Sequence, residues 1–253
     1  MNHKETERLR KSRMTMKANF LELEEFETDQ EKGVTQPPLV KAVDGERILL
    51  PSWESLDERQ LSLKTLFYNR ASRRKFSLEP LTQEELSWLL FSTQGIKKKV
   101  NDKATYRPVP SGGARHSFET YLVLFHVEGL VPGLYYYDPV EHGLVLIEKG
   151  EFGQAAIEGT LDQDFAGNAA VTFVWACIPY RSEWRYHISA HKTMLLDAGH
   201  ICQNLYLAAE SIGCGTCAIA AYDQEKMDQL IHVDGEDEFV VYVAPVGRRP
   251  EKN

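Results

Sequence analysis

Positive charge, cysteine and long apolar runs are all scarce in this 253-residue sequence, and each shortage excludes a class of protein. The 29 Lys and Arg residues are outnumbered by 37 Asp and Glu, so the net charge of −8 opposes binding to nucleic acid or to anionic membranes. Four cysteines are too few and too clustered for a secreted disulfide framework, and we expect reduced thiols. The longest nearly unbroken apolar run, residues 169–178, is far shorter than the ~20 residues of a membrane helix.

These shortages leave an ordinary globular protein, with 43% hydrophobic and 26% charged residues. We expect it to be cytoplasmic, because no apolar segment follows the basic residues near the N-terminus. Residues 1–50 read as an irregular arm, charged at first and then rich in turn-forming residues, and residues 51–253 read as one domain.

The domain mixes expected helices and strands in an α+β order. A short helix is expected from residue 57 onward, a second from Thr82 to Gly95 with capping-box spacing, and a long buried one over 194–212. Strands are expected over residues 120–127, 133–138, 144–148, 169–178 and 238–246, the second and third forming a hairpin at the sheet edge. The loop 97–116 lies between the second helix and the first strand.

Three separate segments combine fixed positive charge with hydroxyls or small residues, namely 70–74, 111–115 and 247–249. Alternating Arg70, Ser72 and Arg74 project to one side of an extended segment, where two guanidinium groups beside a hydroxyl can bind one phosphate. Taken alone, such a run more often indicates a solvated surface. No G-x-G-x-x-G opening a helix and no G-x-x-x-x-G-K-[ST] occurs, so neither a Rossmann nor a P-loop site is supported.

Six short motifs in order resemble the flavin-dependent nitroreductase superfamily, and within it the SagB-type dehydrogenases that oxidise azoline rings in peptides. The motifs are RASRR (70–74), PSGGARH (110–116), GLYYYD (133–138), DAGHICQN (197–204), GCGTCAIAAYD (213–223) and VGR (246–248). Each motif alone is weak, but the match spans about three quarters of the chain.

The resemblance implies an α+β nitroreductase sandwich, with a mixed and mostly antiparallel sheet flanked by helices, formed as a homodimer that binds FMN between subunits. The implied FMN-binding residues are Arg70, Ser72, Arg74, Pro110, Ser111, Gly112, Gly113, Ala220, Ala221, Arg248 and Arg249. The arginines would hold the phosphate, and the loop 111–114 would pass along the flavin edge from the other subunit. Backbone N–H groups near Ala220 and Ala221 would face the flavin N5 and O4 atoms.

The resemblance also implies that 197–204 lies in the dimer core. For His200 we favour a structural role, as a core histidine with its hydrogen bonds satisfied, over a catalytic role. For Asp197 a structural role is as well supported as a functional one.

The sequence departs from the azoline oxidases at the pair that serves them as base and proton relay. A Lys-Tyr pair in the family falls here on Arg185 and Tyr186, the implied catalytic residues. Arginine stays protonated and cannot act as a base, which argues against azoline oxidation unless His187 or His191 replaces it. A polar loop surface explains Tyr186 and both histidines equally well.

The pair Cys214 and Cys217 has C-x-x-C spacing, but without a second pair it is a weak metal signal, and we expect reduced structural thiols and no metal. Two functions remain. The first is an FMN oxidoreductase that works by a ping-pong mechanism, with NAD(P)H as a candidate donor and a peptide heterocycle, quinone or nitroaromatic as substrate. The alternative is a non-catalytic flavin-binding or peptide-docking subunit of a biosynthetic complex.

Overall fold

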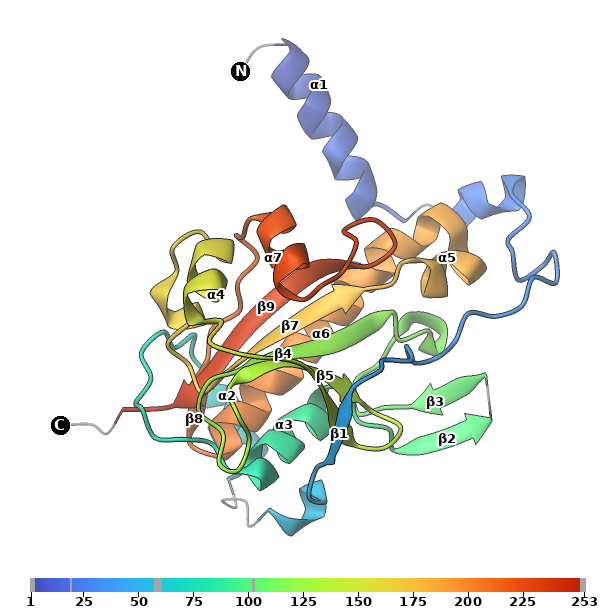
Figure 1. The fold of residues 1–253 in the computed structure, drawn as a ribbon. Helices are drawn as coiled ribbons and strands as arrows, with labels where there is room; N and C mark the ends of the chain where they lie inside the picture. The colour runs from blue at the N-terminus through green and yellow to red at the C-terminus, as the bar shows by residue number, and fades with distance from the viewer. Residues whose placement is uncertain (1–2, 19, 57–60, 102, 251–253) are drawn as a thin grey trace.

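A seven-stranded antiparallel sheet forms the centre of the protein (Figure 1). The computed structural model describes residues 3–18, 20–56, 61–101 and 103–250. The strand order is β1-β6-β5-β4-β7-β9-β8, and β2 and β3 form a separate hairpin. The strands are β1 (Glu46–Leu49), β2 (Lys98–Asn101), β3 (Ala104–Tyr106), β4 (Phe118–Leu124), β5 (Gly133–Asp138), β6 (Gly143–Lys149), β7 (Val171–Cys177), β8 (Cys214–Thr216) and β9 (Phe239–Arg248).

Helices cover both faces of the sheet (Figure 1). The helices are α1 (His3–Ser12), α2 (Leu63–Asn69), α3 (Gln83–Gln94), α4 (Gly153–Gly159), α5 (Tyr180–Tyr186), α6 (Ala190–Ser211) and α7 (Gln224–Leu230). Strand β7 explains the layering, because Phe173 and Trp175 pack on the side of α3 and α6, whereas Val174 packs on the side of α4 and α7. Every residue of β7 is buried, as its continuous apolar run predicts.

The α+β class and the mostly antiparallel sheet are confirmed, and the ends of several elements match the expected ones closely. The capping box of α3 forms as predicted, with the Thr82 hydroxyl accepting from the backbone N–H of Glu85 and the Glu85 carboxylate accepting from that of Thr82. Helix α6 begins four residues earlier than expected, at Ala190, because its first turn is polar and carries no apolar periodicity.

The hairpin of β5 and β6 was expected at the sheet edge, and this is wrong. Strand β1 pairs antiparallel with β6 and forms that edge instead. Strand β1 comes from the expected arm, whose first part also holds helix α1, which projects away from the sheet (Figure 1). A domain boundary at residue 50 stays a prediction. No helix in the described part of the chain has the length and apolar character to cross a bilayer.

Candidate functional site

Two of the predicted segments meet at the β8 edge of the sheet. Ser72 forms a parallel bridge with Thr216, and the backbone N–H of Arg73 donates to the Thr216 carbonyl at 2.9 Å. Strand β8 also pairs with β9, where Cys214 lies opposite Arg248. Residues 70–74, 214–216 and 246–248 therefore lie side by side, although they are far apart in the sequence.

Tyr206 of α6 joins this surface to the turn that follows β8. Its hydroxyl lies 3.0 Å from Ser72 Oγ and accepts a hydrogen bond from the backbone N–H of Ala218 at 2.9 Å. The Arg70 guanidinium lies 5.4 Å from the centre of the Tyr206 ring, within the range of a cation–π contact. Sequence reasoning missed Tyr206, because it sits in a helix whose apolar residues lie nearly all round.

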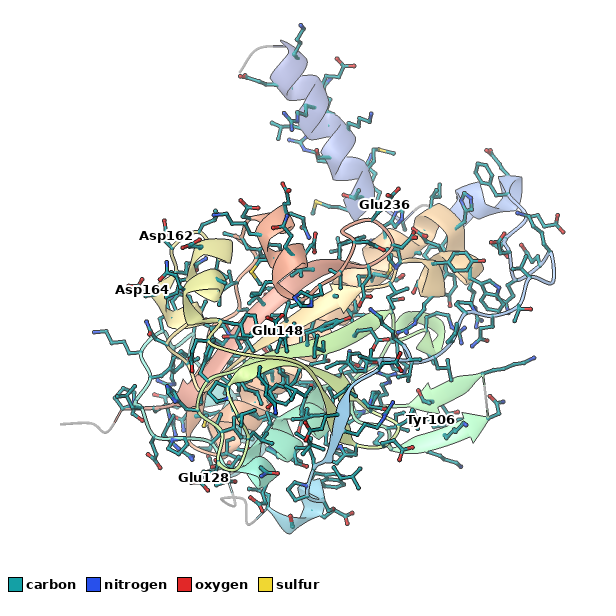
Figure 2. The ribbon with its side chains drawn as sticks, in the orientation of Figure 1. Tyr106, Glu128, Glu148, Asp162, Asp164 and Glu236 are labelled. Carbon is teal, nitrogen blue, oxygen red and sulfur yellow. The ribbon has the colours of Figure 1, made fainter. Side chains whose placement is uncertain are left out.

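The turn after Ala218 continues the surface toward α4. Ala220 and Ala221 are exposed, and their backbone N–H groups donate to no other group in the described part of the chain. The Ala221 carbonyl accepts from the Gln163 side chain, and Arg74 lies 5.8 Å from the ring of Phe165. Figure 2 labels Asp162 and Asp164 in this region, beyond the end of α4.

The four predicted phosphate arginines divide into two groups by their partners. Arg70 and Arg74 form no ion pair with a carboxylate within the described ranges. Arg248 is held by both Glu85 oxygens at 2.7 and 2.8 Å, and Arg249 by Glu210 at 2.5 Å. The Arg248 pair with Glu85 raises the pKa of the Arg248 guanidinium. Arg70 and Arg74 are thus available to an anion, whereas phosphate binding by Arg248 and Arg249 stays a prediction and would require them to share existing carboxylate partners.

The predicted flavin-edge loop lies elsewhere in the same chain, toward the start of α6. The backbone N–H of Gly112 donates to both carboxylate oxygens of Asp197, at 3.1 and 3.2 Å. Asp197 precedes Tyr206 by nine positions along α6. About 14 Å of helix therefore separates the loop from the surface around Arg70, Ser72 and Arg74, which we call the arginine surface. One chain brings Arg70, Ser72, Arg74, Ala220 and Ala221 together but keeps Pro110, Ser111, Gly112 and Gly113 apart from them.

Asp197 positions this loop. Burial raises the pKa of its carboxyl group, while hydrogen bonds from Ser111 and Gly112 act in the opposite direction. The Ser111 hydroxyl in turn accepts from the backbone N–H of His116 at 2.9 Å. The loop is therefore tied at both ends to buried groups.

The predicted catalytic pair stands beside the loop. Gly113 has a left-handed φ of +59°, and a Cβ there would lie 2.3 Å from the Tyr186 hydroxyl, so only glycine allows this close approach. The Arg185 guanidinium lies 5.4 Å from the Tyr186 ring. His187 stacks on Phe26, and His191 Nε2 lies 2.7 Å from Glu183 Oε1. Tyr186 is the member of this group that reaches the loop.

Helix α6 leaves one stripe of its surface uncovered in the single chain. Leu195, Leu196, Gly199, His200 and Gln203 are all exposed, and their spacing follows one side of the helix. His200 is exposed in the single chain, so its burial in a dimer core stays a prediction. A Cβ built on Gly199 would meet no atom within 4 Å, so the centre of the stripe is open.

The cysteines are free and buried, as expected. Burial raises the pKa of the Cys214 thiol to about 12, so it stays protonated and unreactive at neutral pH.

The residues of the arginine surface fit a phosphorylated ring cofactor. Arg70 and Arg74 supply positive charge that no described carboxylate neutralises, and Ser72 supplies a hydroxyl between them in the sequence. The exposed N–H groups of Ala220 and Ala221 offer donors that no protein group uses among the described residues. FMN has this combination of an anionic end and a ring edge rich in acceptors.

A helix-covered antiparallel sheet with such a surface defines a class of α+β oxidoreductases. Residues 68–248 match the Nitroreductase family, and the chain belongs to it. It is 30% identical over 195 residues to the protein named Putative nitroreductase MJ1384 of Methanocaldococcus jannaschii, covering 77% of this chain and 95% of that one. It is also 29% identical to the trifolitoxin-processing protein TfxB of Rhizobium leguminosarum, covering 59% of this chain but only 41% of TfxB.

Solved structures agree on the fold. A nitroreductase-like protein of Ralstonia eutropha superposes with a TM-score of 0.66 at 24% identity, covering 86% of this chain and 96% of the other. The NADPH:FMN oxidoreductase of Vibrio harveyi superposes with a TM-score of 0.53 at 17% identity, covering 74% of this chain and 68% of the other. The chain is thus an oxidoreductase of the Nitroreductase family.

Replacing Tyr206 by phenylalanine should weaken FMN binding about tenfold. The change removes the hydroxyl that joins Ser72 to Ala218 and leaves a half-buried N–H without its acceptor, at a cost of about 1–3 kcal/mol. Equilibrium titration of the apoprotein with FMN measures this. Tyr135→Phe is the matched control, because it removes one tyrosine hydroxyl bond, to the Val131 carbonyl, far from this surface. Equal FMN affinity in both variants would contradict the role given to Tyr206.

Proposed function

We propose that the protein is an FMN-dependent oxidoreductase, similar to the SagB-type dehydrogenases, that works as a homodimer. The observation that carries the proposal is that Arg70 and Arg74 have no carboxylate partner among the described residues and lie beside the open N–H groups of Ala220 and Ala221. Bound FMN would supply an N5 atom that takes a hydride from one reactant and returns it to a second. The residues of this chain would bind, orient and polarise it.

The binding roles follow from charge and geometry. Arg70, Ser72 and Arg74 would hold the phosphate through charge-assisted hydrogen bonds. The Ala220 and Ala221 N–H groups would favour negative charge on the reduced ring, which promotes its reduction. Tyr206 would keep the two parts of the site at a fixed separation, because its hydroxyl contacts both Ser72 and Ala218.

The position of the second half of the site supports the homodimer. The loop with Pro110, Ser111, Gly112 and Gly113 lies about 14 Å along α6 from the arginine surface of its own chain. Pairing two chains across the open stripe of α6 would place this loop, together with Tyr186, over the partner's arginine surface. The uncovered leucines of the stripe support such a pairing.

The catalytic roles rest on Tyr186 and Arg185. Tyr186 would exchange a proton with the substrate, since its hydroxyl abuts the loop at Gly113. Arg185 would attract an anionic group of the substrate rather than act as a base, because a guanidinium remains protonated. The likeness to a trifolitoxin-processing protein favours a peptide substrate over a quinone or a nitroaromatic compound.

Turnover separates this function from a non-catalytic flavin-binding or peptide-docking subunit. Anaerobic addition of NADH or NADPH should bleach the flavin absorbance, and addition of an acceptor should restore it. Bound flavin that neither donor reduces, with no other reductant effective, would favour the non-catalytic subunit.

Replacing Gly199 by arginine should convert the dimer to a monomer and remove the flavin. The position is open in the single chain, so the chain should still fold, but a long charged side chain would block the stripe of α6. Light scattering coupled to size-exclusion chromatography measures the mass, and Glu128→Arg, at an exposed position outside the stripe, serves as the control. A Gly199→Arg variant that remains dimeric and flavin-bound would exclude this interface.

A further inference from the structure

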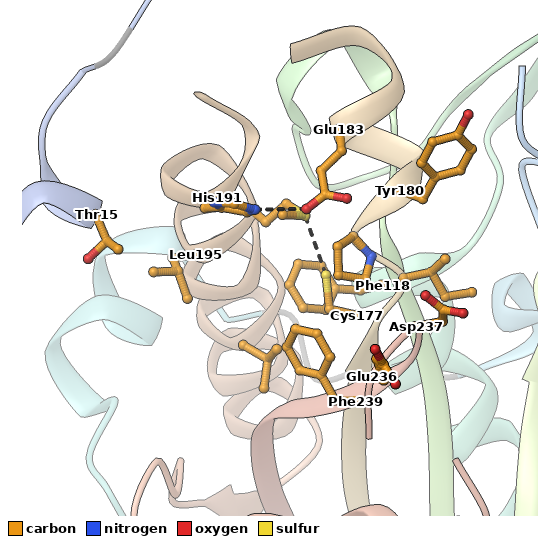
Figure 3. A pocket seen from close by; sticks show the side chains of 14 residues that line it. Thr15, Phe118, Cys177, Tyr180, Glu183, His191, Leu195, Glu236, Asp237 and Phe239 are labelled. Atoms are coloured by element: carbon orange, nitrogen blue, oxygen red, sulfur yellow. Dashed lines mark hydrogen bonds and ion pairs between the residues drawn. The ribbon is translucent and has the colours of Figure 1, made fainter. Parts of the chain in front are cut away.

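A large cavity lies beside the start of α6 (Figure 3). Its volume is about 730 Å³, within the range of roughly 300–1,000 Å³ typical of small-molecule sites. It is bounded by α5, the start of α6, the end of β7 and the start of β9. None of the residues that line the cavity belongs to the six family motifs.

The body of the cavity is apolar. Phe118, Ile178, Met194, Phe239 and Val241 form its walls, and Phe239 stands in the middle of the view in Figure 3. The thiol of Cys177 is also there, but it donates to the sulfur of Met194, and burial raises its pKa. The walls therefore suit an apolar group and offer no reactive one.

Carboxylates account for the charge of the cavity, apart from the His191 imidazole that pairs with Glu183. Three carboxylates line it, those of Glu183, Glu236 and Asp237, and the residues that line it include no lysine or arginine. Glu183 is bonded to His191, whereas Glu236 and Asp237 project from the exposed loop before β9 (Figures 2 and 3). An anion would be repelled here, and a cation would be attracted.

The cavity is distinct from the proposed flavin site. His191 and Met194 of α6 face it, together with Leu195, which also belongs to the exposed stripe. Thr193 and Asp197 face Gly112 instead. Residues 70–74 and 218–221 do not line it. The cavity and the proposed FMN-binding residues thus share no residue.

We propose that this cavity binds a small organic cation, namely a protonated amine carried on an apolar chain or ring. The apolar body would fill the space between Phe118 and Val241, and the ammonium group would lie at the side of Glu236 and Asp237. The size of the cavity, its apolar walls and the two carboxylates of Glu236 and Asp237 together select this chemistry. The proposal does not depend on the flavin.

Three probes of the same shape and different charge test the proposal on the purified full-length protein. These are 4-phenylbutylamine, 4-phenylbutan-1-ol and 4-phenylbutyrate, each measured by isothermal titration calorimetry. We expect the amine to bind at least tenfold more tightly than the carboxylate, with the alcohol between them, and its affinity to fall as salt is raised. Equal affinities for the three probes, or no binding of any, would overturn the proposal.

Two variants locate the binding. Glu236→Gln with Asp237→Asn should weaken the amine about three- to tenfold and leave the alcohol unchanged, whereas Glu128→Gln with Glu141→Gln, at exposed positions elsewhere, should change neither. Val241→Trp should fill the cavity and abolish binding of all three probes. Amine binding that survives both the charge-removing pair and the cavity-filling change would place the amine elsewhere and refute the site.

Discussion

Replacing both Arg70 and Arg74 by alanine should weaken FMN binding by at least a hundredfold. Charge-assisted hydrogen bonds are worth about 1.5–3 kcal/mol each, so losing two of them should cost about 3–6 kcal/mol of binding free energy. Neither arginine has a carboxylate partner within the described ranges, so their removal leaves no acid unpaired and should cost little folding stability. The double variant should be purified colourless, and titration with FMN measures the loss of affinity.

The matched control is Arg47→Ala, which removes an exposed arginine on β1 that pairs with Asp138. It should bind FMN as the unaltered protein does. Retention of full FMN affinity by the double variant would show that the phosphate lies elsewhere.

The protein should lose stability on acidification because of His116. Burial, together with the neighbouring Arg107, lowers the pKa of His116 to about 3. An unfolded chain binds a proton at this histidine below a pKa of about 6.5, whereas the folded chain does not. The free energy of unfolding should therefore fall by about 1.4 kcal/mol per pH unit between pH 6.5 and pH 3, and this contribution is fully present above pH 6.5.

Denaturant unfolding at pH 7.0 and pH 4.5 measures the slope. His116→Asn should flatten it by about 2–3 kcal/mol over this interval, while His126→Asn, which changes an exposed histidine, should leave it as it is. Identical slopes in all three proteins would mean that His116 takes up a proton within the folded state. Because the backbone of His116 is bonded to Ser111, its protonation should also loosen the flavin-edge loop.

The sequence predicts the strong elements well, because their signals are local. The capping box of α3 and the continuous apolar run of β7 each depend on neighbouring residues, and both were found where expected. Strand β8 was missed, since Cys214, Gly215 and Thr216 are too few to show a period and owe their conformation to pairing with β9. Strand β1 was missed because its conformation depends on its long-range pairing with β6.

The sequence predicts where the positive charge of the site lies, but not which carboxylates pair with its arginines. Arg70, Ser72 and Arg74 were identified from their spacing, but the sequence does not reveal that Glu85 and Glu210 neutralise Arg248 and Arg249. In the sequence, Glu85 is recognisable only as a helix-capping residue. Its second partner, Arg248, lies 163 residues away along the chain. Tyr206 shows its role only when the helix is placed against Ser72 and Ala218.

The central claim is that this chain holds FMN on the surface of Arg70, Ser72 and Arg74. The most direct test is the visible spectrum of the freshly purified protein, followed by mass determination of what denaturation releases. The account predicts a flavin spectrum and the release of one FMN per chain. A colourless protein that takes up no FMN when the cofactor is added would contradict it.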